Sequence, residues 1–482
     1  MRHFRSVAIL VVLTVLAVAP LIVRAQEKQH PRDVSKLYGE LCASCHGPTL
    51  TGAQAPSLLD DVWKFGGDDA SITKSIKEGS VAAGMPPMGH ALSEQEIRAM
   101  VIFIREEAAK FKRGQSTFAR PAAAATVVKS ELHAFKLETV VNRLDVVWGI
   151  DFLPDGRMLL TEKAGRLRIV ENGKLVPTPV AGVPAVAADG QGGLLDVAVH
   201  PDYATNGWIY LSYSDPGPNG SAMTAIVRGK LQGGQFVEQQ TVYKAPTELY
   251  RTGGNHFGSR FVFDKGYLFF SIGERGRQDD AQDLTRPNGK VHRIFDDGRV
   301  PDDNPFVGKA GALPTIWSYG HRNPQGLARD PSTDLLYDAE HGPRGGDELN
   351  LVQKGRNYGW PVITYGMNYD GTPMTDLTAK EGMEQPVNYW VPSIAVSSVA
   401  FYRGTKFPKW DGQLFLGALA QEELRRLVLS DGKVTHQEVL FKNVGRVRDV
   451  VNGPDGYIYV TFDGGRVARL VPAPGEPTTA SR

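Results

Sequence analysis

Both cysteines of the chain lie in a single pentapeptide, Cys42-Ala43-Ser44-Cys45-His46. Two thiols separated by two residues can each add to one vinyl group of a haem, and a histidine directly after them can coordinate the iron. A zinc site would need further Cys and His pairs at short spacing, which this sequence does not contain. A thioredoxin-type thiol pair would follow a strand, whereas this pentapeptide follows a helical pattern. The pentapeptide therefore predicts a covalently bound c-type haem, with His46 as one iron ligand.

A methionine-containing loop offers the second iron ligand. Met85 and Met88 lie in segment 84–90, which is rich in Gly and Pro and gives a side chain no helical face to pack on. Iron held by His and Met has both axial positions filled, so it transfers electrons and binds no substrate. We predict Met85 as the ligand, with Met88 as the alternative. This part of the chain resembles class I cytochrome c domains, whose sixth ligand lies in a Met-Pro loop before the last helix.

Two helices would hold this haem. Asp33 can cap a helix that ends at the haem motif. Ser93 and Glu96 form a capping box at the start of another helix. Apolar residues then recur at helical spacing, at Ile97, Met100, Val101 and Ile104. We predict a small all-α haem domain over residues 30–110 and a linker over residues 111–136.

The first 25 residues have the form of a secretory signal peptide. Basic residues at the start precede an apolar run over residues 7–23, and Ala25 lies at the expected cleavage point. An uncleaved anchor is the alternative, because the run approaches the length that spans a membrane. Covalent haem attachment in bacteria also takes place outside the cytoplasm, so both features predict a periplasmic protein. The formal net charge of +1 provides no basic surface for nucleic acid.

From about residue 137 the pattern changes to short apolar strands separated by Asp- and Gly-rich turns. A unit of strand, turn and strand occurs six times, over residues 152–162, 199–212, 261–271, 327–338, 399–417 and 451–460. One such sheet cannot bury both of its faces, whereas a ring of sheets can, and the ring leaves few open edges. We predict an all-β six-bladed propeller over residues 137–471 and a tail over 472–482, with a pair of β-sandwiches as the alternative.

Five segments between these strands are polar and rich in glycine, although a blade needs neither feature. They are residues 190–193, 253–258, 320–326, 340–348 and 445–449. Glycine lets the backbone approach a ligand closely or adopt a positive φ. In content and order these segments resemble the soluble pyrroloquinoline quinone (PQQ)-dependent sugar dehydrogenases of the glucose/sorbosone dehydrogenase type, above all the aldose sugar dehydrogenase branch. The resemblance covers almost all of residues 137–471 and leaves out the haem domain, which is a fusion.

The resemblance implies a catalytic pair. His256 matches the base that takes a proton from a sugar hydroxyl, a task that suits an imidazole titrating near neutrality. Arg322 matches the arginine beside the quinone carbonyl that accepts the hydride, where a cation stabilises the developing oxyanion. Asn323 matches a position that hydrogen-bonds the cofactor, and Gln191 matches one near the reacting carbonyl.

The resemblance also implies a calcium ion at the quinone. Gly342 and Pro343 match backbone carbonyls that bind Ca²⁺, a hard cation that prefers oxygen ligands. Asp347 matches a nearby carboxylate. His341 departs from the pattern, because it stands where the glucose dehydrogenases carry a glutamine that contacts the cofactor.

Arg446 and Arg448 match cofactor-binding arginines of the family. Residues two apart on a strand face the same side, so their guanidinium groups can act together. Two such groups on one face suit the carboxylates of PQQ.

Together these features predict a periplasmic quinohaemoprotein that oxidises an aldose to its lactone. Two electrons would arrive on PQQ as a hydride and leave singly through the haem to an external acceptor, which is a cytochrome, a quinone or a copper protein. No nucleic-acid partner is expected, and no stable membrane insertion once the signal is cleaved. The alternative is a propeller without PQQ, acting as a metal-dependent lactonase or as a carbohydrate-binding module linked to a cytochrome.

Overall fold

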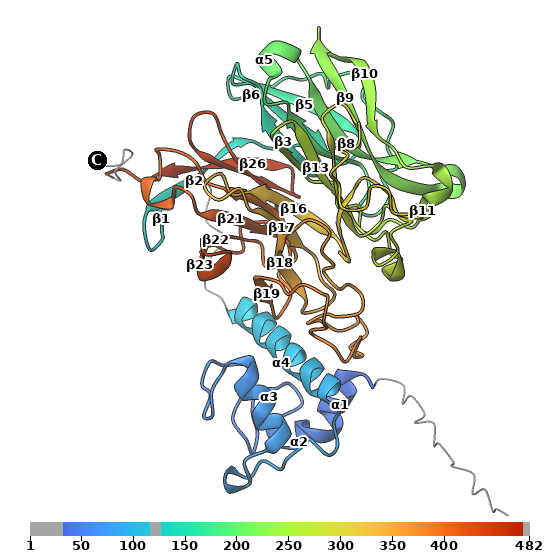
Figure 1. Ribbon diagram of the computed structural model, residues 1–482. Coiled ribbons are helices and arrows are strands. Elements are labelled where there is room, and N and C mark those ends of the chain that lie inside the picture. The colour runs from blue at the N-terminus through green and yellow to red at the C-terminus, as the bar shows by residue number, and fades with distance from the viewer. Residues whose placement is uncertain (1–31, 116–126, 476–482) are drawn as a thin grey trace, which may run out of the picture. The chain divides into compact units, whose positions relative to one another are not determined.

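Helices occupy the first part of the chain and strands the rest (Figure 1). The structure is a computed structural model that describes residues 32–115 and 127–475. The predicted signal peptide and residues 476–482 of the predicted tail lie outside these ranges. The helices are α1 (Val34–Leu41), α2 (Ala43–His46), α3 (Asp69–Glu78) and α4 (Glu94–Gln115), with a 3₁₀ turn, η1 (Val81–Ala83), before α4. Among the described helices, none is both long and apolar enough to cross a membrane.

Both predicted helix starts are confirmed by side-chain caps. The Asp33 carboxylate accepts hydrogen bonds from the backbone N–H groups of Ser35, at 2.7 Å, and Lys36, at 3.1 Å. At the start of α4 the bonds are reciprocal. The Ser93 N–H donates to Glu96 Oε2 at 2.9 Å, and the Glu96 N–H donates to Ser93 Oγ at 3.3 Å. Each helix therefore begins where unpaired N–H groups find a partner.

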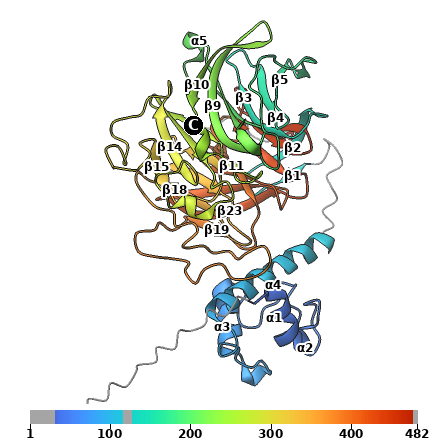
Figure 2. The same ribbon diagram turned by 90° about the vertical axis from the view of Figure 1, so that its right-hand side faces the viewer.

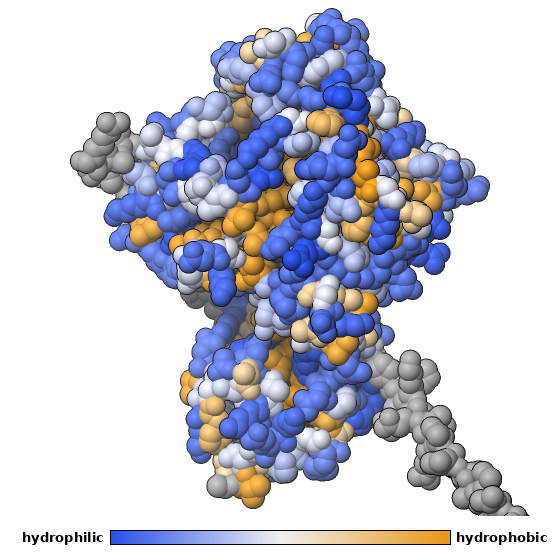
Figure 3. Space-filling view, viewed as in Figure 1, coloured by the Kyte–Doolittle hydropathy of each residue, from blue (hydrophilic) through white to orange (hydrophobic). Residues whose placement is uncertain are grey.

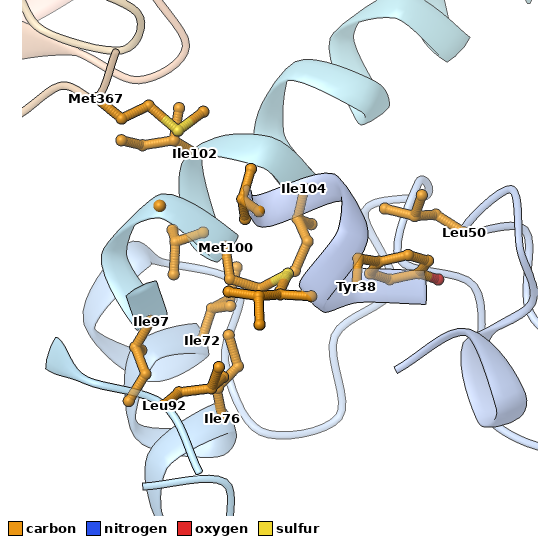
Figure 4. Packing of buried hydrophobic residues seen from close by; sticks show 14 of the residues in the cluster. Tyr38, Leu50, Ile72, Ile76, Leu92, Ile97, Met100, Ile102, Ile104 and Met367 are labelled. Carbon is orange, nitrogen blue, oxygen red and sulfur yellow. The ribbon is translucent and has the colours of Figure 1, made fainter. Parts of the chain in front are cut away.

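The core of the helical part lies between α1, α3 and α4 (Figure 4). The predicted apolar face of α4 is buried, and α3 meets it with Ile72 and Ile76. α4 continues to Gln115, five residues past the predicted end of the domain, and Lys112 and Arg113 lie in its last turn. Cations there interact favourably with the helix dipole. The predicted linker over residues 111–136 is therefore too long at this end.

Six four- or five-stranded antiparallel sheets make up the rest of the described chain, as predicted (Figures 1 and 2). The first three blades are β3 (Val147–Phe152), β4 (Met158–Glu162), β5 (Arg166–Glu171) and β6 (Lys174–Leu175); β7 (Leu194–Val199), β8 (Ile209–Pro216), β9 (Ser221–Gln232) and β10 (Gln235–Tyr243), with β11 (Arg251–Thr252) beside β9; and β12 (Phe261–Asp264), β13 (Tyr267–Ile272), β14 (Lys290–Phe295) and β15 (Ile316–Tyr319). The next two blades are β16 (Pro324–Arg329), β17 (Leu336–Glu340), β18 (Asp347–Val352) and β19 (Asn388–Trp390); and β20 (Val396–Phe401), β21 (Leu414–Ala418), β22 (Glu423–Ser430) and β23 (Lys433–Phe441). Each predicted strand–turn–strand unit forms the two inner strands of one blade.

The last blade joins the two ends of the β domain. It contains β24 (Val447–Asn452), β25 (Ile458–Phe462), β26 (Arg466–Pro472), β2 (Ala134–Val141) and β1 (Val128–Lys129). β2 pairs antiparallel with β26, which places Leu137 opposite Leu470. The β domain therefore begins at Val128, inside the segment predicted to be linker, because β1 and β2 are needed to close the ring. Short helical turns lie between strands: α5 (Tyr203–Asn206), η2 (Pro218–Gly220), η3 (Thr247–Leu249), η4 (Gln278–Ala281) and η5 (Pro408–Trp410).

Hydrophobic packing between neighbouring sheets holds the blades together. Two of the largest clusters are buried between adjacent blades, one around Trp410 and Phe415 and another around Leu211 and Phe236. Hydrophilic residues cover most of the face shown in Figure 3, and hydrophobic residues show there in patches across the propeller. Each blade therefore covers an apolar sheet face of the next.

A single arginine connects the inner strands of five blades. Arg260, directly before β12, lies 2.8 Å from Asp196 Oδ1 on β7 and 2.9 Å from Asp449 Oδ2 on β24. Its Nε donates to the Gln325 carbonyl on β16 at 3.1 Å, and its guanidinium lies 4.4 Å from the ring centre of Trp148 on β3. All of these side chains are buried. Arg260 therefore balances the two carboxylates at the place where the blades meet.

We predict that Arg260→Met destabilises the protein by about 3–5 kcal/mol, because Asp196 and Asp449 would keep buried charges without their partner. Chemical denaturation measures the change in the free energy of unfolding. Arg403→Met is the matched control: its pair with Asp411 leaves the Arg403 side chain 46% exposed, and such pairs contribute less than about 1 kcal/mol. Equal effects of the two substitutions would contradict this role for Arg260.

Candidate functional site

The predicted site residues come from one end of the blades. Gln191, His256, Arg322 and Arg446 each precede the first strand of a blade, and His341 lies between the second and third strands of the blade that follows Arg322. In an up-and-down sheet, the entry to the first strand and the turn after the second strand lie at the same end. The fold therefore brings together segments that are far apart in the sequence.

The loops that carry Gln191 and His256 interlock. The Gln191 N–H donates to the Gly254 carbonyl at 2.6 Å, and Gln191 Oε1 accepts from the His256 N–H at 2.8 Å. Gly190 has a φ of +53°, and a Cβ there would lie 2.5 Å from the Gly254 oxygen. Only glycine allows this approach. Gln191 thus positions the backbone of His256 in this structure.

A buried carboxylate orients the His256 ring. His256 Nδ1 contacts Glu274 Oε1, and the Glu274 side chain is almost fully buried in the β13–β14 loop. Since the carboxylate accepts the hydrogen bond, Nδ1 carries the proton and Nε2 of the neutral ring is left as the basic atom. The backbone N–H of Glu274 donates to the Arg322 carbonyl at 2.8 Å. Glu274 was not predicted. Its position as a carboxylate in the same blade as the proposed base could have indicated it.

The environment of His256 favours its neutral form. Burial lowers the pKa of His256 and outweighs the Glu274 hydrogen bond, which raises it, while the nearby charge of Arg322 lowers the pKa further. The ring is therefore uncharged near neutral pH. A neutral imidazole with a carboxylate behind it is suited to accept a proton and then to be stabilised as a cation.

Arg322 is fixed by two carbonyls and two aromatic rings. Its Nη1 donates to the carbonyls of His341, at 3.1 Å, and Gly342, at 2.6 Å. Its guanidinium lies 5.2 Å from the ring centre of Trp360 and 6.0 Å from that of Tyr369. These contacts hold a positive charge in one orientation. Arg322 and His256 are linked through Glu274, so the predicted catalytic pair does lie together.

Several buried polar atoms in this region have no hydrogen-bond partner among the described residues: Asn323 Nδ2, His341 Nε2 and, beside His256, Glu274 Oε2 and Arg275 Nε. Asn323 Oδ1 accepts from the Gly258 N–H at 3.1 Å, which leaves the amide nitrogen free to donate. Burial, with the charges of Arg448 and Arg322, lowers the pKa of His341 well below its usual value. A buried polar atom without a partner is costly, so atoms of this kind fit a ligand that supplies the missing bonds.

Arg446 and Arg448 converge on one carboxylate, as their spacing predicts for residues on one face. Arg446 Nε lies 2.9 Å from Asp463 Oδ2, and Arg448 Nε lies 2.8 Å from Asp463 Oδ1. Burial tends to raise the pKa of Asp463, but Arg448 and Arg446 hold it below its usual value. Arg448 Nη1 also donates to Gln325 Oε1 at 3.0 Å. Asp463 was not predicted, because its Asp-Gly-Gly segment after β25 has the composition of an ordinary turn.

Asp347 supports the turn that follows His341. Its Oδ1 accepts from the Gly342 N–H at 3.0 Å, and its Oδ2 accepts from the Ala395 N–H at 2.5 Å. Burial raises the pKa of Asp347 to about 6. Both oxygens of this carboxylate therefore accept hydrogen bonds from backbone N–H groups, one in each of two neighbouring blades.

The carbonyls of Gly342 and Pro343 do not form an open calcium site in this structure. The Gly342 oxygen accepts from Arg322 Nη1. The Pro343 oxygen accepts two hydrogen bonds, from Ser393 Oγ at 2.9 Å and from the Gly346 N–H at 3.1 Å. A carbonyl has two lone pairs, so the Pro343 oxygen has none left for a cation. The ligand set implied by the family resemblance does not fit here.

A charged cluster lies behind Arg322. Ligand atoms of His321, Asp338 and Glu340 lie within 4.8 Å of one another, and all three residues are buried. Burial lowers the pKa of His321, but Glu340 and Asp338 raise it to about 9. A protonated imidazole between two carboxylates offsets part of their negative charge. Glu340 Oε2 also accepts from the Arg322 N–H at 2.7 Å, so the cluster holds the Arg322 backbone.

The haem motif lies at the end of α1 and in α2. Cys42 and Cys45 are partly buried and are not joined by a disulfide, and burial raises the pKa of the Cys42 thiol to about 11. His46 Nδ1 lies 3.0 Å from the Pro56 carbonyl, so Nδ1 donates and Nε2 is free to bind a metal. Met85 and Met88 are both half-buried against the core of the helical part. The arrangement fits a haem and leaves both methionines as candidates for the second ligand.

Sequence comparison assigns the propeller. A profile of the Glucose / Sorbosone dehydrogenase family matches residues 144–470. The chain belongs to this family. It is 47% identical to an aldose sugar dehydrogenase of Escherichia coli over 334 residues, which cover 68% of this chain and 90% of that protein. It is 28% identical to quinoprotein glucose dehydrogenase B of Acinetobacter calcoaceticus over 424 residues, which cover 70% of this chain and 87% of that protein.

Solved structures agree with this assignment. The apo form of the Escherichia coli aldose sugar dehydrogenase superposes with a TM-score of 0.66 at 45% identity, covering 70% of this chain and all of that one. The PQQ-bound form of an aldose sugar dehydrogenase from Streptomyces coelicolor gives a TM-score of 0.57 at 28% identity, covering 73% of this chain and 99% of that one. The propeller is therefore a sugar dehydrogenase domain of the aldose type.

The helical part matches a different family. Residues 29–104 match a profile described as cytochrome c oxidase, cbb3-type, subunit III. A cbb3-type oxidase subunit of Bradyrhizobium diazoefficiens is 35% identical over 72 residues, which cover 14% of this chain and 24% of that protein. The chain therefore joins a cytochrome c domain to a sugar dehydrogenase propeller, as the sequence predicts.

The Glu274 contact gives a prediction that needs no bound cofactor. Removing the carboxylate in Glu274→Gln takes away a group that favours the imidazolium, so we expect the pKa of His256 to fall further below that of the unsubstituted protein. A pH titration of the His256 ring by NMR measures this change. Glu238→Gln, at an exposed position on β10, should leave the titration unchanged. An unaltered pKa in Glu274→Gln would show that the two side chains do not interact in solution.

Proposed function

We propose that this protein is a PQQ-dependent aldose dehydrogenase that oxidises the anomeric carbon of its sugar to a lactone and passes the electrons to a c-type haem in the same chain. The observation that carries the proposal is the convergence of His256, Arg322 and two unpartnered buried atoms, Asn323 Nδ2 and His341 Nε2. The family assignment and the PQQ-bound Streptomyces relative support it.

The side chains around His256 suit an anionic, hydrogen-bonding cofactor. Arg322 and Arg448 provide positive charge, and Asn323 and His341 provide buried atoms that lack partners. When bound, PQQ would supply the acceptor for the hydride. These residues would hold it through its carboxylates and carbonyl oxygens, because guanidinium groups bind such oxygens strongly. No step here depends on calcium, since the Pro343 oxygen has no lone pair left for a cation.

His256 would act as the base. Its Nε2 takes the proton from the anomeric hydroxyl as the carbonyl of the lactone forms, and Glu274 stabilises the imidazolium that results. Arg322 places a fixed positive charge where negative charge develops on the acceptor oxygen, which lowers the barrier without reorganisation. Gln191 and Asn323 hold the backbone on either side of the base.

The cytochrome c domain would receive the electrons. Cys42 and Cys45 would attach the haem, and His46 would bind its iron through Nε2. Helix α4 contacts the segment beside the site, because Arg344 Nη2 lies 2.5 Å from Glu106 and Arg344 directly follows Pro343. Met367, from the β18–β19 connection, belongs to the same buried cluster as Ile102, and Figure 4 shows the two side by side. These contacts support transfer within the chain, where the effective concentration of the partner is high.

Export to the periplasm and an external acceptor complete the proposal. The basic start and apolar run of the N-terminus, with the cytochrome c domain, support the location. A cytochrome, a quinone or a copper protein would take electrons from the haem. A lactonase would instead need carboxylate and amide groups converging on a metal, whereas here two arginines and two histidines meet.

The direct test is sugar-dependent dye reduction by the purified full chain with and without added PQQ. We expect turnover only with PQQ, and we expect His256→Asn to lose it while PQQ still binds, because asparagine keeps hydrogen bonding but cannot take the proton. His436→Asn, at an exposed position on β23, is the control. Turnover that persists in His256→Asn would remove the proposed base. Lactone hydrolysis without dye reduction would favour the alternative.

The haem gives a second prediction. Methionine ligation raises the reduction potential of a haem relative to other ligand sets, so Met85→Ala should lower the midpoint potential. Met88→Ala, which removes a methionine from the same loop, should leave the potential near that of the unsubstituted protein. Spectroelectrochemical titration of both variants distinguishes them. A lower potential in Met88→Ala alone would assign the ligand to Met88.

A further inference from the structure

A buried arginine next to Glu274 holds the loop that carries His256. Arg275 is 2% exposed and has a φ of +59°. Its Nη2 donates to the carbonyls of Gly253 at 2.7 Å and Arg251 at 3.3 Å, and its Nη1 donates to the Asn255 carbonyl. Three carbonyls of one loop therefore converge on one guanidinium.

The side of the guanidinium is covered by the same loop. The Arg275 guanidinium carbon lies 3.5 Å from the ring centre of Phe257, the residue after His256. Its Nη2 also lies 3.4 Å from the Ala222 carbonyl on β9. Through the backbone carbonyls of this segment, Arg275 thus ties residues 251–257, which include His256 next to their end, to the neighbouring blade.

Burying the Arg275 guanidinium removes it from water, and it forms no salt bridge among the described residues that would offset this loss of solvation. Burial lowers the pKa of Arg275 to about 10, and the neighbouring charge of Glu274 offsets only part of that effect. Burying a cation whose hydrogen-bond partners are all carbonyls costs free energy. A planar guanidinium with five donors can serve several carbonyls at fixed angles, which the ammonium of lysine cannot do.

We propose that Arg275 is a positioning residue of the sugar oxidation: it clamps loop 251–257 so that the imidazole of His256 meets Glu274 in one orientation. The expected effect of Arg275 on catalysis rests on the proposed function of His256, whereas its effect on loop 251–257 does not. Glu274 and Arg275 divide the task, because the carboxylate fixes the ring and the guanidinium fixes the backbone that carries it.

The charge of Arg275 has a second effect that separates this role from simple packing. His256 is faced by Glu274 from the β13–β14 loop, by Arg322 from the segment before β16, by His341 from the β17–β18 turn, and by Arg275. Arg275 and Arg322 both disfavour the imidazolium, whereas Glu274 favours it. Removing the Arg275 charge should therefore raise the pKa of His256, the opposite of the effect of removing Glu274.

The test compares Arg275→Lys, which keeps the charge, with Arg275→Met, which loses it. In the full chain without PQQ, we expect hydrogen exchange in residues 251–257 to be faster in both variants, measured by mass spectrometry. We expect the NMR titration of His256 to move to higher pH only in Arg275→Met. Arg426→Lys, at a buried arginine of β22 that contacts Glu438 and Glu131, is the control and should alter neither property.

With PQQ, both variants should lose about tenfold or more in kcat with a smaller change in KM, because a misplaced base slows chemistry more than binding. If Arg275→Met does not fold, the measurements on Arg275→Lys alone test the proposal. Exchange in residues 251–257 that matches the unsubstituted protein, or a kcat of Arg275→Lys within about twofold of it, would overturn the proposal. Since exchange and titration are measured without PQQ, a failure of the clamp is distinguishable from a failure of the proposed function.

Discussion

Inner strands from five of the six blades of this protein meet at one buried arginine and two buried carboxylates. Arg260 lies between Asp196 and Asp449 and contacts the inner strands of four other blades. An unpaired carboxylate in this place would be costly, so the strands must keep the register that brings all three groups together. Gln191, His256, Arg322 and Arg446 each lie just before one of these same inner strands. A rigid ring thus supplies fixed starting points for loops that glycine allows to approach one another.

In the candidate site too, each proposed functional side chain is fixed by a hydrogen-bond or ion-pair partner. Glu274 holds the ring of His256, two carbonyls hold Arg322, and Asp463 holds Arg446 and Arg448. Asn323 Nδ2 and His341 Nε2 are among the buried atoms that lack a hydrogen-bond partner within the described residues. Preorganisation of this kind reduces the cost of ordering the site when substrate and cofactor bind. The same contacts set the charge of His256, because its pKa reflects burial, one carboxylate and the surrounding cations.

Local patterns predicted the elements of this structure, and contacts across blades explain what they missed. Alternating apolar residues and Asp-Gly turns found the two inner strands of all six blades, and the capping box at Ser93 found the start of α4. The first three residues of β2, 134–136, were assigned to the linker because the partner strand, β26, lies more than 300 residues away, and no local pattern shows such a pairing. Glu274, Arg275 and Asp463 were missed for a different reason, since they lie in loops or turns whose residue types do not show which side chains or carbonyls they contact. The calcium site implied for Gly342 and Pro343 does not fit, because the Pro343 oxygen already accepts two hydrogen bonds. The residue types alone could not show those bonds.

The central claim is that a sugar dehydrogenase propeller and a haem on one chain form a single electron-transfer unit. The most direct measurement is anaerobic stopped-flow spectroscopy of the PQQ-loaded protein mixed with an aldose, with no external acceptor present. The account predicts that the haem becomes reduced with a rate constant that does not change with protein concentration, as expected for transfer within one molecule. A rate that rises in proportion to protein concentration, or a haem that stays oxidised while the sugar is consumed, would contradict it.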